Sequence, residues 1–125
     1  MENAEEYTLH CQADTKAANE ALASMRDEGG RWWIYLVSHA TFELVVGKPL
    51  GDDNVVLSLQ GCDHIAGPTE WQEQKLEVIW EPSRPREFVI QDRSVGFKAV
   101  GKGFAWKRNF DLLAERSLYL GRIGI

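Results

Sequence analysis

Residues 61–80 read GCDHIAGPTEWQEQKLEVIW, which places a polar loop between two segments of alternating apolar and polar side chains. The loop carries the densest polar chemistry of the chain, because Cys62, Asp63 and His64 are consecutive. Loops that connect the elements of a rigid sheet often hold binding and catalytic groups. The sequence therefore predicts a candidate site between Gly61 and Trp71, although its spacing specifies no reaction.

The predicted ligand- or partner-binding residues all come from this one loop. They are Cys62, Asp63, His64, Glu70 and Trp71. Trp71 is expected at the rim of the site, since tryptophan often dominates the energy of an interface. The sequence assigns no catalytic residue, and we expect neither a metal ion nor another cofactor.

A zinc site is the first alternative to this interpretation. Cys62 and His64, joined by His10 and Cys11, would supply a Cys2His2 ligand set. However, a strand sends the neighbours His10 and Cys11 to opposite faces, and the spacing matches no usual ligand pattern. The pattern therefore favours cysteines that are buried as small apolar side chains.

A small enzyme is the second alternative. A Cys62 nucleophile would need a histidine base and a carboxylate to orient that base, but the acidic loop offers no cation to lower the thiol pKa. His10, His39 and His64 are the available bases. Acid and base catalysis by Asp63, His64 or Glu70 in a pocket of a concave sheet is the enzymatic reading that stays open.

The composition indicates one globular domain over residues 1–125, with 44% hydrophobic and 26% charged residues. No apolar run approaches the roughly 20 residues of a membrane-spanning helix. The N-terminus, MENAEE, is acidic, whereas a signal peptide would begin with basic residues. We therefore expect a cytoplasmic protein, without membrane contact, whose two cysteines are reduced thiols.

The net charge of -5 is distributed unevenly along the chain. Residues 1–83 contain 5 Lys+Arg and 15 Asp+Glu, whereas residues 84–125 contain 9 and 4. We expect the fold to interleave the two parts, so that their charges neutralise one another. An acidic chain without a phosphate-binding motif argues against nucleic-acid binding, despite four basic residues between Lys98 and Arg108.

Apolar periodicity predicts one long helix and a series of strands. Residues 7–12 alternate and predict a first strand, and a helix then begins at Asp14 or Thr15 and ends at Gly29-Gly30. Residues 31–38 are apolar on both faces, which indicates a strand inside the sheet, with Trp32 and Trp33 on opposite faces. The later strands are predicted at residues 41–46, 55–60, 76–81 and 86–92.

A hairpin is predicted near the C-terminus, with Lys102-Gly103 as a two-residue turn. In this register Phe97, Ala99, Phe104 and Trp106 share the core face, and the lysines face solvent. A short helix is expected to begin at Asn109, and a last strand is expected over residues 118–125.

These elements predict an α+β fold: one N-terminal helix packed on a curved, mostly antiparallel sheet of about six to eight strands, with a short second helix near the C-terminus. The predicted function is a non-enzymatic interaction or ligand-binding domain, such as an acidic inhibitor or immunity-type protein that binds a protein partner. A homodimer is also expected, because a second sheet face with a tryptophan and Ile79 would otherwise be uncovered. No family motif is recognised in the chain.

Overall fold

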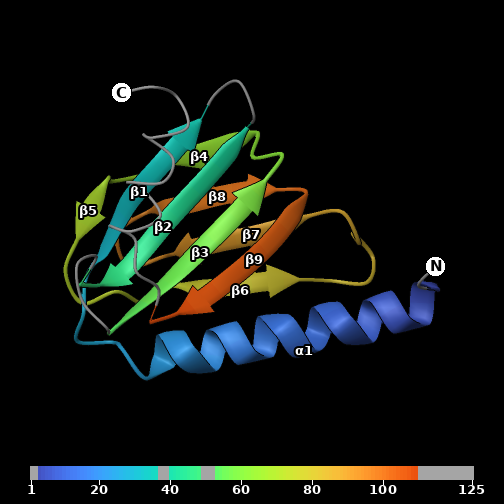
Figure 1. Cartoon of the computed structure of the whole chain (residues 1–125). Coiled ribbons are helices and arrows are strands. Elements are labelled where there is room, and N and C mark those ends of the chain that lie inside the picture. The colour runs from blue at the N-terminus through green and yellow to red at the C-terminus, as the bar shows by residue number, and fades with distance from the viewer. Residues whose placement is uncertain (1–2, 37–39, 49–52, 110–125) are drawn as a thin grey trace, which may run out of the picture.

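A computed structural model describes residues 3–36, 40–48 and 53–109 of the chain (Figure 1). The described residues form one helix and two antiparallel sheets. In chain order the elements are α1 (Ala4–Ala23), β1 (Gly30–Leu36), β2 (Thr41–Gly47), β3 (Asn54–Gln60), β4 (His64–Ala66), β5 (Glu70–Trp71), β6 (Glu77–Trp80), β7 (Phe88–Asp92), β8 (Phe97–Gly101) and β9 (Gly103–Arg108). The predicted α+β class and its N-terminal helix are confirmed.

The helix begins ten residues earlier than the sequence pattern predicts, so the predicted strand at residues 7–12 is wrong. The side chain of Asn3 caps the helix, because its Oδ1 accepts a hydrogen bond of 2.8 Å from the amide of Glu6. Cys11, Thr15, Ala18 and Leu22 are buried at helical spacing on one face, whereas Leu9 is 61% exposed. The six alternating residues fit a short strand as well as they fit a helix, which is why the local pattern predicted the wrong element.

The strands form two sheets rather than the single curved sheet that we predicted. The first sheet has the strand order β5-β1-β2-β3-β9, and the second sheet has the order β4-β8-β7-β6 (Figure 1). The chain changes from one sheet to the other four times: between β3 and β4, between β4 and β5, between β5 and β6, and between β8 and β9. The predicted C-terminal helix and last strand fall on residues 110–125, outside the described residues.

β8 and β9 do not pair with each other, so the predicted hairpin is wrong. The prediction of which side chains face the core is confirmed. β8 pairs with β4 and β7, whereas β9 pairs with β3. Phe97 and Ala99 are buried, and Phe104 and Trp106 pack half-buried against the same core. At Lys102, whose amide donates to the carbonyl of Gln60 over 2.8 Å, the chain leaves one sheet for the other. The alternation of side chains is local, but the choice of partner strand is not.

The core lies between the two sheets and beneath α1. Trp32 contributes to it, with its ring 5.2 Å from that of Phe42, whereas Trp33 packs on the other face of the first sheet against Val45 and Val56. This arrangement confirms that the two tryptophans point in opposite directions. A shift of register between Trp32 and Ile34 marks a bulge in β1 at this point.

Side chains of helix α1 form hydrogen bonds with an edge strand of each sheet. The side-chain amide of Asn19 both donates to the carbonyl of Val78 (2.9 Å) and accepts from its amide (2.7 Å), as a neighbouring strand would. Nearer the N-terminus of the helix, Asp14 Oδ1 accepts a hydrogen bond of 3.1 Å from the indole of Trp106 on β9. The helix therefore covers the side of the molecule where β6 and β9 are the edge strands (Figure 1).

Candidate functional site

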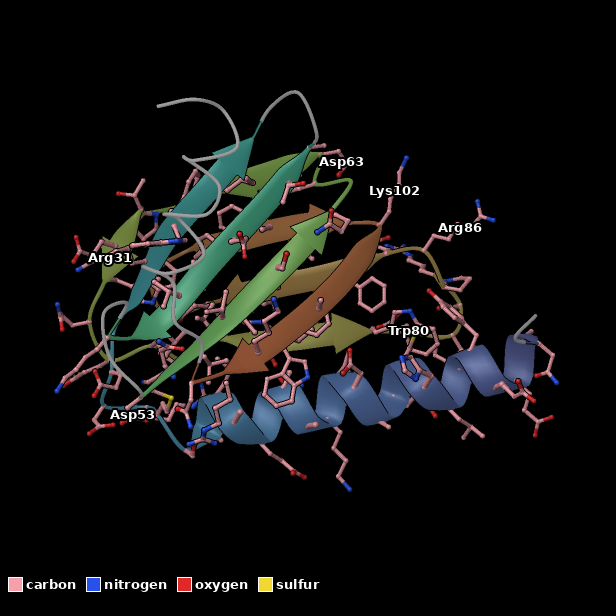
Figure 2. All side chains as sticks on the ribbon, in the orientation of Figure 1. Arg31, Asp53, Asp63, Trp80, Arg86 and Lys102 are labelled. Atoms are coloured by element: carbon pink, nitrogen blue, oxygen red, sulfur yellow. The ribbon has the colours of Figure 1, made fainter. Side chains whose placement is uncertain are left out.

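The loop from Gly61 to Trp71 contains two short strands that belong to different sheets. β4 pairs with β8 in the second sheet, and β5 pairs with β1 in the first. Asp63 lies between β3 and β4 and Lys102 lies between β8 and β9, at two of the crossings between the sheets, and their side chains point outward at the same corner (Figure 2). The predicted site is thus built on a connection that links the sheets.

Cys62 is buried, with 4% of its surface exposed. Its amide donates to the carbonyl of Ala40 over 2.7 Å, and its thiol donates to the carbonyl of His64 over 3.7 Å. Burial raises the pKa of the Cys62 thiol, the carboxylate of Asp63 raises it further, and backbone hydrogen bonds at His64 and Val100 oppose the rise. A protonated, buried thiol is not an activated nucleophile.

Asp63, His64 and Glu70 are all exposed. Glu70 forms an ion pair of 2.8 Å with Arg31 on the neighbouring strand β1. His64 lies opposite Val100 in the second sheet, so the histidine and the glutamate belong to different sheets. This arrangement gives the small-enzyme alternative no support, and that alternative stays a prediction.

Trp71 lies in the core rather than at a rim. Its surface is 7% exposed, and its ring centre is 4.9 Å from that of Phe97. The indole Nε1 donates to Oδ2 of Asp92 over 2.9 Å. Trp71 therefore connects β5 to a buried carboxylate on the second sheet, and sequence reasoning missed that carboxylate.

Asp92 accepts hydrogen bonds from three separate residues. Besides Trp71, the amide of Lys75 donates to its Oδ2 over 2.7 Å, and both the amide and the hydroxyl of Ser94 donate to its Oδ1. Burial alone would raise the pKa of this carboxyl, but the hydrogen bonds from Ser94, Lys75 and Trp71 outweigh that effect and hold the pKa below its ordinary value. Asp92 thus acts as a buried anchor for the residues after β5.

None of the five predicted site residues lines the following two hollows on the surface of the described residues. The larger, of about 650 Å³, runs along α1 beside β6 and is lined mainly by polar side chains such as Lys16 and Glu20. The smaller, of about 180 Å³, lies over β6, β7 and β8. Among the residues that the structure describes, no three His, Cys, Asp or Glu side chains are grouped so that they could hold a metal ion.

The smaller hollow lies on the face of the second sheet that points away from the core, here called the outer face. One row of side chains crosses all four strands of this face, because the register aligns His64 with Val100, Val100 with Val89, and Val89 with Ile79. We call these four residues the outer row. Its three aliphatic members are half-buried, and His64 is exposed. His64 is therefore the one predicted site residue that joins a larger surface feature.

Charged side chains stand on both sides of the outer row. Glu81, Arg84 and Glu87 lie on one side, and Glu77, Arg93 and Lys98 lie on the other. Within each side one ion pair forms, Arg84 with Glu87 at 3.6 Å and Arg93 with Glu77 at 3.8 Å. The outer face thus combines an apolar centre with charged flanks.

No family model matches this chain. No solved structure matches it either. Within the part of the chain that the structure describes, no helix combines the length and the apolar character that crossing a membrane requires.

The four basic residues between Lys98 and Arg108 do not form a single surface. Lys98 lies on the outer face of the second sheet, whereas Lys107 and Arg108 lie on β9 of the first sheet. The predicted dimer face is divided in the same way, since Trp33 belongs to the first sheet and Ile79 to the second. The alternation in β6, β7 and β8 indicates which of their side chains share a face. The outer row itself could be predicted only if the order of these strands in the sheet were also known.

Proposed function

We propose that this chain is a non-catalytic interaction domain that binds a folded protein partner through the outer face of the second sheet. The observation that carries the proposal is the outer row, in which Ile79, Val89 and Val100 are only half-buried on an open sheet face. Apolar side chains with a charged surround are typical of the centre and rim of a protein interface.

Among the side chains that the structure describes, the first sheet has no comparable group of half-buried aliphatic residues on its outward side. On its face away from the core, Val45 is 0% exposed and Val56 is 2% exposed. The corresponding aliphatic residues of the second sheet are half-buried, and a hollow lies beside them. This contrast favours the second sheet as the binding surface.

The chemistry of the outer face favours a protein over other ligands. The hollow of about 180 Å³ is smaller than the roughly 300–1,000 Å³ of typical small-molecule sites. The two flanks carry as many acidic as basic side chains, whereas a nucleic-acid surface needs an excess of cations for the phosphates. A protein surface can match both signs of charge.

The predicted inhibitor- or immunity-type role is compatible with this surface and stays a prediction. Asp63 and His64 are exposed beside β4, at one edge of the outer face, so they are accessible to a partner that covers this edge. Buried Cys62 and Trp71 would support the surface from within rather than touch the partner.

Site-specific photo-crosslinking tests the proposal. We would replace Val89 with p-benzoylphenylalanine in the full chain, irradiate it in extract of its own cells, and use Ala105, which is exposed on β9, as the matched control position. We expect one defined adduct from position 89 that excess unlabelled wild type suppresses, and no such adduct from position 105. Equal labelling from the two positions, or no adduct from position 89, would overturn the proposal.

A further inference from the structure

The charges on the outer face are not symmetric about the outer row. Glu87 lies on one flank, immediately before the central strand β7, and Lys98 lies on the other flank, on the neighbouring central strand β8. Each flank also contains one internal ion pair. Apart from those pairs, one flank has the carboxylate of Glu81 and the other has the ammonium of Lys98, so the flanks differ in sign.

A two-fold axis makes this pattern self-complementary. If two copies pack face to face with the axis along the outer row, the rotation lays each row on its counterpart and exchanges the flanks. The flank with Glu87 in one copy then faces the flank with Lys98 in the other. Adjacent strands are only about 4.8 Å apart, so Glu87 and Lys98 come within reach of an ion pair, in addition to the one that Glu87 forms with Arg84 in its own copy, and symmetry forms the new pair twice.

We infer that the partner on the outer face is a second copy of this chain, an inference that rests on the proposed function. A purely acidic or purely basic partner would match one flank and repel the other. A second copy matches both flanks at once and places Val89 and Val100 against aliphatic side chains. Charge complementarity of this kind fixes the orientation of an interface more than it raises its affinity.

The size of the face implies a weak dimer. Four strands about 4.8 Å apart and about five residues long, at about 3.3 Å per residue, cover roughly 300 Å² of flat area. A stable complex buries about 800 Å² from each partner, so the dimer is expected to dissociate at micromolar concentrations. Measurements must therefore reach high protein concentration.

Charge reversal in purified full-length protein tests the inference. Sedimentation velocity from about 10 μM to 1 mM should show a concentration-dependent dimer for the wild type. Lys98→Glu and Glu87→Lys should each lower the association constant at least about tenfold, because like charges then face each other twice, and the double variant should recover it. Lys107→Glu makes the same change of charge on β9 and should leave association unchanged.

The outcomes separate this inference from the proposed function. An adduct from position 89 with twice the mass of the 14.2 kDa chain supports both. An adduct with a different protein, together with a wild type that stays monomeric at 1 mM, overturns the homodimer and leaves the interaction domain standing. A dimer that neither charge reversal weakens would place the interface elsewhere and overturn the inference.

Discussion

The indole Nε1 of Trp71 donates a hydrogen bond of 2.9 Å to Oδ2 of Asp92, and this bond links the last residue of β5 to the last residue of β7. The amide of Lys75 donates to the same oxygen over 2.7 Å. Because β5 belongs to the first sheet and β7 to the second, Asp92 connects the two sheets from within the core. The C-terminal end of the predicted site is thus a structural connection.

Replacing Asp92 with Asn should lower the free energy of unfolding by about 2–3 kcal/mol at pH 7. The variant loses the charge that strengthens its hydrogen bonds, and its NH2 group would face the N–H donors of Trp71 or Lys75. Urea unfolding followed by tryptophan fluorescence measures the change. Asp63→Asn, at an exposed position, is the matched control and should cost less than about 0.5 kcal/mol. Equal effects of the two substitutions would contradict the anchoring role of Asp92.

The contribution of Asp92 should also depend on pH in a defined direction. Its pKa is lower in the folded protein than its ordinary value of 3.8, so the charged form favours folding. That stability is fully present above the ordinary value and disappears as the pH falls through the lower folded value. The difference in unfolding free energy between wild type and Asp92→Asn should therefore be constant from pH 7 to pH 5 and shrink below pH 4. A difference that grew on acidification would contradict this assignment.

Gln74 is the second buried polar residue that holds this part of the chain. Its Nε2 donates to the carbonyls of Leu22 (2.9 Å) and Met25 (2.8 Å) at the end of α1, and its Oε1 accepts from the amide of Leu76 and from Arg26. Gln74→Leu should cost about 3 kcal/mol, because these buried groups lose their partner. Gln72→Leu, at an exposed position two residues away, should be nearly neutral in the same urea titration.

The sequence was informative where structure depends on neighbouring residues. Alternation located β2, β3, β6 and β7, and it predicted that Phe97 and Trp106 face the core. Alternation failed where contacts with residues distant in the sequence determine the type of element or the partner strand. The segment at residues 7–12 joins a helix because its buried residues fit a longer helical stripe, and β9 pairs with β3 although β8 is its neighbour in sequence.

The candidate site shows the same limit. Cys62, Asp63 and His64 were adjacent and polar, but adjacency did not reveal that the first is buried and the other two are exposed. Asp92 and Gln74 were missed because their partners lie 21 and 52 residues away, at Trp71 and Leu22. Nothing in the types or spacing of these residues marks such contacts before the fold is known.

Glu73 has a φ of 50°, in the left-handed region that favours glycine. Glu73→Gly should therefore raise the free energy of unfolding by up to about 1 kcal/mol, since it removes the cost of the side chain in this conformation. Gln72→Gly is the control at the preceding residue, where φ is not positive, and it should lower stability through the entropy of the unfolded chain. Thermal unfolding of the two variants distinguishes backbone strain from a general effect of glycine. A loss of stability in both would contradict the prediction.

The thiol of Cys62 should react slowly with iodoacetamide in the folded protein. It is 4% exposed and its pKa is raised above the ordinary value of 9.0, so the thiolate is scarce at neutral pH. Labelling followed by mass spectrometry should be slower than that of a short peptide containing residues 60–66, and its rate should still be rising above pH 9. Cys11, which is also 4% exposed, gives a comparison within the same molecule. Labelling of Cys62 as fast as in the peptide at pH 7 would contradict the suppressed reactivity of this thiol and would favour the enzymatic reading of the loop.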